Sequence, residues 1–216
     1  MLTFLILIGD LDVEKRNLVK IIDRFGPEFT IEFDIQVQDS QPRSYDSHSD
    51  QIYNLFHLTA TGGNCCNNGD QVPAAGVTYR NGAPHLYISV TMPHHQVYYA
   101  KLTPGKWHSV KMNVQKIADY QSVFMVHLDN KQVWEIHVTP IQYTDVHWYL
   151  SNPWDESVAR IADLKNFSIT YTQGLNNILR PILFMVLYSC VFCRDWSPPW
   201  NIRIWHGCSE VHRNEG

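Results

Sequence analysis

The chain has 216 residues, 44% of them hydrophobic and 18% charged, which suits one globular domain with or without a tail. Its formal net charge is −4, and no basic stripe is visible along the sequence. The electrostatic footprint of a nucleic-acid-binding protein is therefore missing, and we expect no nucleic-acid partner.

Residues 1–11 contain an apolar run, Leu2–Ile8, without the basic flank that usually precedes the hydrophobic region of a secretory signal peptide. Two interpretations remain open: the first strand of the domain, or the remnant of a signal peptide. The missing basic flank favours the strand.

The strongest periodic signal follows the turn sequence RFGP. Phe29, Ile31, Phe33, Ile35 and Val37 alternate with polar residues, which predicts a strand with one buried and one wet face. Weaker alternation occurs in five later segments. The apolar residues that we expect to share one strand face in each are Ile52, Phe56, Leu58; Leu86, Ile88, Val90; Val110, Met112, Val114; Val146, Trp148, Leu150; and Phe167, Ile169, Tyr171. Turn clusters separate these segments, and no convincing amphipathic helix lies between them, so we predict an all-β antiparallel sandwich or barrel.

The segment VFMVHLDNKQVWEIHV predicts a hairpin whose register follows from matching the apolar faces of its two strands. Pairing Val126 with Trp134 requires a three-residue loop, Asp129–Lys131, in which asparagine tolerates the left-handed backbone conformation. A two-residue loop would place Phe124 opposite Glu135. We therefore expect the three-residue loop.

Residues 173–216 show no clean alternation and form an atypical tail. Their apolar run, Pro181–Cys193, is shorter than the roughly 20 residues that span a bilayer, and it follows Arg180 directly. We predict a buried or interfacial segment, with membrane association through the tail as the alternative.

Four motifs occur in order along residues 12–172: a G-x-W-H strand start, a v-x-v strand, a v-D-x hairpin and a late i-x-x-l strand. They comprise Gly105, Trp107 and His108; Val110 and Val114; Val126, Leu128, Asp129 and Asn130; and Ile161, Leu164, Phe167 and Ile169. This series resembles the concanavalin A-like lectin/glucanase superfamily, especially its laminin-G-like jelly-roll domains, although Asn130 replaces the usual glycine. The resemblance implies a two-sheet antiparallel β-sandwich, a jelly roll, that binds glycans or extracellular proteins, often with calcium at one rim.

Some relatives of this kind are glucanases, which need two carboxyl groups facing each other across a cleft. Glu32 and Asp34 share a strand face, but the glucanase-like pattern E-x-D-x-x-E is broken because Gln36, Val37 and Gln38 follow. The general acid is missing, so we expect a non-catalytic protein. A glycoside hydrolase on the same fold and a structural or assembly module remain the alternatives.

We expect ligand contacts at the loop rim of the sandwich, on these turn residues: Asn64, Asn67, Asp70, Trp154, Asp155 and Glu156. A tryptophan ring stacks on the apolar side of a sugar ring, while carboxylates accept its hydroxyl protons. Trp154 could equally cap the open end of the sandwich.

No cofactor is predicted. Calcium remains an option because Asp70, Asp129, Asp155 and Glu156 all fall on turns, although no single-loop calcium motif exists. The single CxxC at Cys190–Cys193 lacks the second ligand pair of a zinc site, so no metal site is predicted.

Two of the five cysteines, Cys65 and Cys66, are adjacent in a run of glycine and asparagine. Their Cα atoms must lie about 3.8 Å apart, which is below the usual disulfide separation of about 4.4–6.8 Å. Three interpretations remain open: a rim loop with free or vicinally bonded thiols, pairing with another chain or with a tail cysteine (Cys190, Cys193 or Cys208), and a metal or redox role.

Asn166-Phe-Ser168 is an N-glycosylation sequon on the outward phase of the last strand. It fits an extracellular, secreted protein. We therefore expect a glycan or an extracellular protein as partner.

Overall fold

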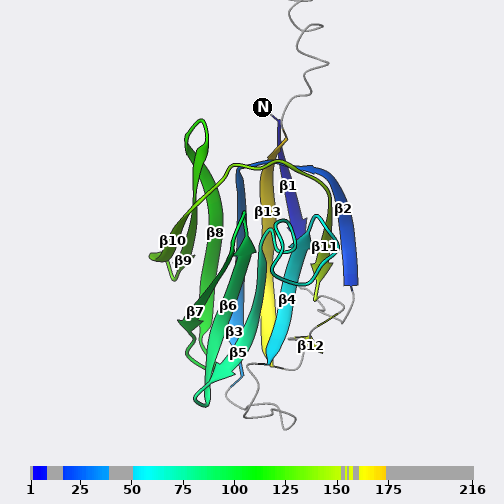
Figure 1. The fold of residues 1–216 in the computed structure, drawn as a ribbon. Coiled ribbons are helices and arrows are strands. Elements are labelled where there is room, and N and C mark those ends of the chain that lie inside the picture. The colour runs from blue at the N-terminus through cyan, green and yellow to red at the C-terminus, as the bar shows by residue number, and fades with distance from the viewer. Residues whose placement is uncertain are drawn as a thin grey trace, which may run out of the picture. The chain divides into compact units, whose positions relative to one another are not determined.

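A computed structural model describes residues 2–8, 17–38, 51–151, 154, 156–157 and 161–173, with only the backbone described for residues 2–8, 156–157 and 173. The described residues belong to one compact unit, residues 1–175. They form two packed antiparallel sheets without a helix, which confirms the predicted β-sandwich (Figure 1). Asp155 and nearly all of the predicted tail lie outside the described residues.

The first sheet has six antiparallel strands. In spatial order they are β1 (Leu2–Ile8), β13 (Ala162–Gln173), β3 (Phe29–Val37), β8 (Trp107–Ala118), β9 (Gln121–Leu128) and β10 (Lys131–Val138). The last strand lies between two early ones, because β13 pairs with both β1 and β3. Segments more than a hundred residues apart in sequence thus share one surface.

The second sheet has seven strands. They are β2 (Asn17–Phe25), β11 (Tyr143–Leu150), β4 (Ile52–Thr59), β5 (Ala74–Arg80), β6 (Ala83–Thr91) and β7 (His95–Lys101) in spatial order, with β12 (Glu156–Ser157) beside β4. The β12–β4 pair is parallel, and the other pairs are antiparallel. No described segment forms a helix long and apolar enough to cross a membrane.

The core lies between the sheets and contains the alternating apolar residues. Phe33 and Phe167 come from the first sheet, and Phe56 and Trp148 come from the second. The Phe167 ring lies 5.4 Å from that of Phe56 and 5.6 Å from that of Trp148, measured between centroids. These contacts join the two layers through their centre.

One residue of the predicted core is misplaced. Ile52 was expected to share a face with Phe56 and Leu58, but it is only partly buried and lies outside the core cluster. An irregularity in the β4–β5 pairing between Asn54 and Phe56 shifts the phase of the strand. Tyr53 joins the core instead.

The predicted β9–β10 register is confirmed at Val126–Trp134, but the predicted loop length is wrong. Lys131 pairs with Leu128, so the turn has two residues, Asp129 and Asn130, both with positive φ. A bulge between Gln132 and Trp134 then restores the apolar match. The hairpin therefore has the expected register, but a two-residue turn and a bulge produce it instead of the predicted three-residue loop.

Candidate functional site

A cavity of about 400 Å³ opens on the outer face of the first sheet. Since Phe33 and Val110 turn into the core, their neighbours Glu32, Asp34 and Lys111 point outward. We call this cavity the groove, and its lining residues are Glu32, Phe33, Asp34, Ser109, Val110, Lys111, His127, Asn130, Asn166 and Ser168. They come from β3, β8, β9, β13 and the β9–β10 turn.

Both groove carboxylates have partners. The Lys111 ammonium lies 2.8 Å from Glu32 Oε1, and Asn166 Nδ2 donates a hydrogen bond of 2.6 Å to Asp34 Oδ2. The groove therefore offers carboxylate acceptors beside amide and ammonium donors. Such a surface suits a ligand with many hydroxyl groups.

His127 provides an unused polar atom in the groove wall. Its Nδ1 is buried and has no hydrogen-bond partner among the described residues. Buried polar atoms in folded proteins nearly always have a partner. This enclosed atom belongs to the wall, so it is not counted among the groups that the groove offers to a ligand.

Trp107 extends the same face beyond the groove. It pairs with Gln36, two residues along β3 from Asp34, and its side chain is 36% exposed. The Lys165 ammonium lies 3.8 Å from its ring centroid, a cation–π contact across β3. An aromatic ring thus stands beside the carboxylates of the groove.

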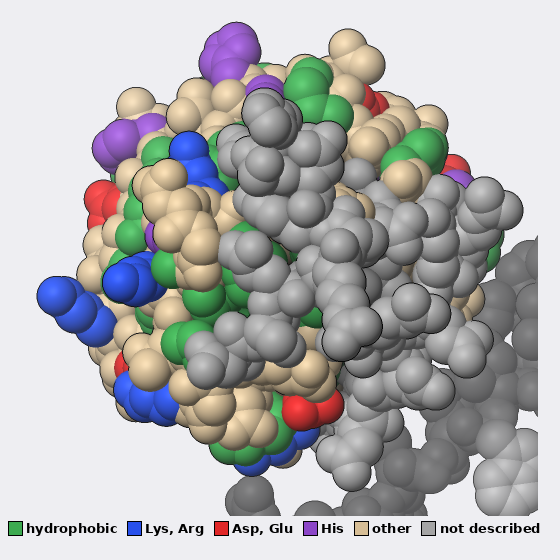
Figure 2. All heavy atoms as spheres, turned by 90° about the horizontal axis from the view of Figure 1, so that it is seen from below, with side chains coloured by type: hydrophobic (Ala, Val, Ile, Leu, Met, Phe, Trp, Pro, Cys, Tyr) green, Lys and Arg blue, Asp and Glu red, His purple; other side chains and the backbone are tan. Residues whose placement is uncertain are grey.

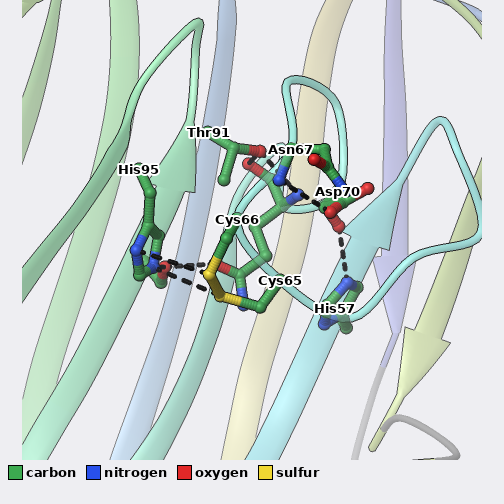
Figure 3. Close-up of a disulfide and its surroundings, with 9 residues drawn as sticks. His57, Cys65, Cys66, Asn67, Asp70, Thr91 and His95 are labelled. Carbon is green, nitrogen blue, oxygen red and sulfur yellow. Dashed lines mark hydrogen bonds between the residues drawn. A yellow bond between two sulfur atoms is a disulfide. The ribbon is translucent and has the colours of Figure 1, made fainter.

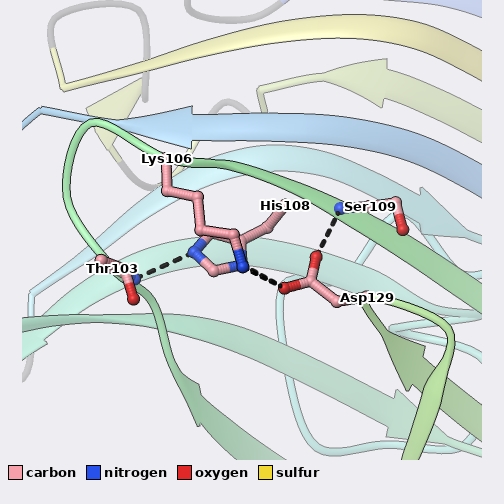
Figure 4. A network of polar contacts seen from close by, with 5 residues as sticks. All are labelled: Thr103, Lys106, His108, Ser109 and Asp129. Carbon is pink, nitrogen blue, oxygen red and sulfur yellow. Dashed lines mark hydrogen bonds and ion pairs between the residues drawn. The ribbon is translucent and has the colours of Figure 1, made fainter.

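A polar network fixes the turn at the groove's end (Figure 4). His108 is buried, accepts a 3.0 Å hydrogen bond at Nε2 from the Thr103 N–H, and donates from Nδ1 to Asp129 Oδ2 at 3.0 Å. Asp129 also accepts from Lys106 Nζ at 3.0 Å and from the Ser109 N–H at 3.1 Å. These bonds hold the turn residue next to Asn130, which lines the groove.

The network sets the charge of Asp129. Partial burial alone would raise the pKa of this carboxyl, but the hydrogen bonds from Lys106, His108 and the Ser109 N–H hold its pKa below the ordinary value of 3.8. The carboxylate therefore stays ionised at neutral pH.

Residues 60–73 connect β4 and β5, and they contain the predicted rim residues Asn64, Asn67 and Asp70. Asp70 is buried there, accepting from the Asn67 N–H at 2.8 Å and from the Thr61 hydroxyl. Its carboxylate thus organises the loop in which Asn64 and Asn67 also lie.

His57 connects this loop to Trp154. His57 Nε2 donates to the Asp70 carbonyl oxygen at 2.7 Å, and the Trp154 ring centroid lies 5.4 Å from the His57 ring. The structure thus brings Asp70 and Trp154 to one histidine. Glu156 is placed only by its backbone, which pairs with Tyr53.

Tyr143 of β11 also holds the β4–β5 loop by a hydrogen bond. Its hydroxyl donates to Asn68 Oδ1 at 3.0 Å, and burial raises the pKa of Tyr143 to about 12. The hydroxyl therefore remains a neutral donor over the physiological range.

Cys65 and Cys66 are joined in a vicinal disulfide at the loop tip (Figure 3). The disulfide follows one of the alternatives that the sequence leaves open. Of the described His, Cys, Asp and Glu side chains, one group of three lies close enough to share a metal ion: Cys65, Cys66 and His95. This group contains no carboxylate, so it is unlike a calcium site.

Charges are dispersed over the end of the sandwich seen from below (Figure 2). Lysine, arginine and acidic side chains are scattered over its described part, and neither sign forms a continuous patch. The described part of this face therefore shows no continuous basic patch of the kind that binds a nucleic acid.

The groove is the site that sequence reasoning missed. Glu32 and Asp34 were recognised as sharing a strand face, but their face was interpreted as solvated. The pairing of β3 with both β8 and β13 brings Lys111 and Asn166 beside them. Alternation reveals which residues face outward but not which strands are neighbours.

No family model matches the sequence, and no curated protein is significantly similar to it. Solved structures with some likeness include an endo-β-1,4-glucuronan lyase from the fungus Trichoderma reesei, with 15% identity over 73% of this chain and 72% of that chain and a TM-score of 0.41. The receptor-binding domain of botulinum neurotoxin type G has 10% identity over 86% of this chain and 46% of that chain, with a TM-score of 0.45. The alginate lyase Aly36B has 9% identity over 75% and 80%, with a TM-score of 0.42. Likenesses this distant assign neither a ligand nor a reaction.

Proposed function

We propose that the protein is a non-catalytic recognition domain that binds a glycan in the groove. The carrying observation is the groove itself, in which Glu32 and Asp34 offer acceptors while Lys111 and Asn166 offer donors. Sugar hydroxyls both donate and accept, so they match a surface with both kinds of group.

The loop rim is the alternative location for the ligand. Trp154 is 40% exposed, close to the 36% of Trp107, so the two tryptophans form a matched pair for locating a ligand. Asp70 is committed to its own loop, in which the predicted contact residues Asn64 and Asn67 also lie. A ligand at the rim would depend on Trp154 and not on the groove.

A glycan array with and without calcium, followed by titration of the best glycan, tests the proposal. We expect Glu32→Gln and Trp107→Ala each to weaken binding about tenfold, which corresponds to about 1.4 kcal/mol for a lost charged hydrogen bond or stacking contact. Trp154→Ala is the matched control and should bind as the wild type does. Loss of binding in Trp154→Ala alone would move the site to the rim, and no glycan binding together with self-association would favour an assembly module.

A polysaccharide-cleaving enzyme is the second candidate, because two carboxylates and an imidazole line one cavity. Hydrolysis requires two carboxyl groups about 5–10 Å apart on opposite sides of the scissile bond. Here Glu32 is paired with Lys111 and Asp34 with Asn166. Release of new reducing ends from a polysaccharide, abolished by Glu32→Gln, would establish the enzyme and overturn the non-catalytic proposal.

We further propose an extracellular location and a glycan on Asn166. Asn166 is exposed, and its Nδ2, the atom to which a glycan is attached, points to Asp34 of the groove. Attachment there would compete with ligand binding. Secretion from a eukaryotic host and mass analysis of the Asn166 peptide test this, and an unmodified peptide from secreted protein would refute it.

A further inference from the structure

We propose that reduction of the Cys65–Cys66 disulfide creates a binding site for a thiophilic divalent metal ion, formed by the two thiolates and the His95 imidazole. This site lies at the tip of the β4–β5 loop and the start of β7 (Figure 3). It is separate in residues and in chemistry from the glycan groove.

The distances fit a shared metal. His95 Nδ1 lies 3.7 Å from Cys66 Sγ, and His95 Nε2 lies 3.8 Å from Cys65 Sγ. The candidate ligand atoms of the three residues lie within 4.8 Å of one another. In a tetrahedral zinc site with Zn–S near 2.3 Å and Zn–N near 2.0 Å, sulfur and nitrogen ligands are about 3.5 Å apart.

A hydrogen-bond chain behind His95 leaves one ring nitrogen ready to bind a metal. Ser89 donates its single hydroxyl proton to Gln71 Oε1, and Ser89 Oγ lies 3.0 Å from His95 Nε2. The hydroxyl oxygen must therefore accept from Nε2–H, which places the lone pair of the neutral ring on Nδ1. Metal-binding histidines are commonly oriented by such a hydrogen bond on the second nitrogen.

The supporting residues are anchored. Ser89 and Gln71 are buried, and the Gln71 N–H donates to Thr91 Oγ1 at 2.8 Å. The Thr91 N–H in turn donates to the Gln71 carbonyl at 2.8 Å, so β6 holds the base of the loop. The imidazole is thus positioned before any metal arrives.

The chemistry balances with a dithiol or phosphine as the reductant. Two electrons and two protons convert the disulfide into two thiols while the reductant is oxidised. The sulfur atoms then separate to about 3.8 Å by rotation of the two side chains, and the metal displaces both thiol protons. A water molecule would complete a four-coordinate ion, because three protein ligands leave one position open.

The test uses the full chain with Cys190, Cys193 and Cys208 changed to serine, so that the loop holds its only thiols. Co²⁺ is added to reduced and to oxidised protein, and thiolate-to-metal charge-transfer absorption is recorded. The affinity for Zn²⁺ is then measured by competition with a chromogenic chelator. We expect one metal ion per reduced chain with the charge-transfer band, and neither in the oxidised chain.

Variants distinguish the proposed metal ligands from Ser89, which orients the His95 ring. Cys65→Ser with Cys66→Ser should abolish binding, and His95→Ala should weaken Zn²⁺ binding at least tenfold, whereas the neighbouring His94→Ala should not. Ser89→Ala should weaken binding about tenfold by freeing the ring, measured at a temperature well below the unfolding of the variant. The proposal fails if the reduced chain binds no metal, or if His95→Ala binds as tightly as the unchanged loop.

Discussion

His108 is buried at the start of β8, and both of its ring nitrogens have partners. An acceptor bond from the Thr103 N–H at Nε2 and a donor bond to Asp129 at Nδ1 define a neutral tautomer. The side chain therefore cross-links the loop before β8 to the turn after β9. The G-x-W-H motif owes its histidine to this structural role.

Asp129→Asn should lower the free energy of unfolding by about 1 kcal/mol at pH 7, because charged hydrogen bonds are lost. The loss is moderate because the Asp129 side chain is 37% exposed and solvent screens its charge. Asparagine keeps the left-handed backbone of this turn position, where φ is 52°. Urea denaturation measures the difference.

The same pair of proteins tests the pKa of Asp129. Because its folded pKa lies below the ordinary 3.8, its contribution is complete above that value and is lost as the pH falls through the folded pKa. The advantage of the wild type over Asp129→Asn should therefore shrink as the pH falls from about 4 to 2. An advantage that stays constant over this range contradicts the assigned network.

Among the elements, the β9–β10 hairpin contributes both to the stability of the fold and to the lining of the groove. Asp129 and Asn130 both have positive φ, as a two-residue type I′ turn demands, and Asn130 also lines the groove. The bulge beyond Gln132 allows this tight turn to coexist with apolar pairing at Val126–Trp134. A single turn residue thus serves the hairpin and the groove.

Replacements of Asn130 separate these two roles. Asn130→Gly should unfold like the wild type but bind a groove ligand more weakly, because glycine adopts positive φ freely and lacks the amide. Asn130→Val should cost about 1–2 kcal/mol of stability, since a β-branched residue is strained at φ 65°. Thermal unfolding and glycan titration of both variants check this, and equal stability of the two would rule out the turn geometry.

At the scale of the whole molecule, the two sheets are held together by their shared aromatic centre. Phe167 contacts Phe33 of its own sheet and both Phe56 and Trp148 of the other. Neither sheet can bury its apolar face without its partner. Unfolding of the sandwich should therefore be cooperative.

Phe167→Ala should lower the free energy of unfolding by about 3–5 kcal/mol, because it removes a fully buried ring between the layers. Tyr120→Ala is the control, since that side chain is 87% exposed, and its effect should stay within about 0.5 kcal/mol. Chemical denaturation of both variants provides the comparison. A similar small effect in both would show that the aromatic centre does not hold the layers.

Removal of residues 176–216 should leave the sandwich intact. The paired strands of the described residues end at Gln173, and the compact unit ends at residue 175. We expect a chain of residues 1–175 to unfold in one transition at the wild-type temperature. Loss of that transition in calorimetry would show that the tail is an integral part of the fold.

Sequence alone predicted the strands whose apolar residues recur at every second position. Alternation placed Phe29–Val37 and the core phases of β6, β8, β11 and β13 correctly. It failed for β5, where both faces are buried and no alternation remains, and for β2, where Leu18 and Ile21 are exposed among polar residues. It also failed for Ile52, because a local irregularity reverses the phase without a signal in composition.

The amino-acid sequence by itself determined that the chain forms antiparallel strands with alternating buried residues, since period-two burial depends on each residue and its immediate neighbours. Only the tertiary structure decided where the polar chemistry gathers. Strand order brings Asn166 to Asp34 across 132 residues, and the packing of a loop against β7 brings His95 to Cys65 and Cys66. These encounters depend on which strands pair, and that choice is set by the burial of the whole core rather than by any local pattern.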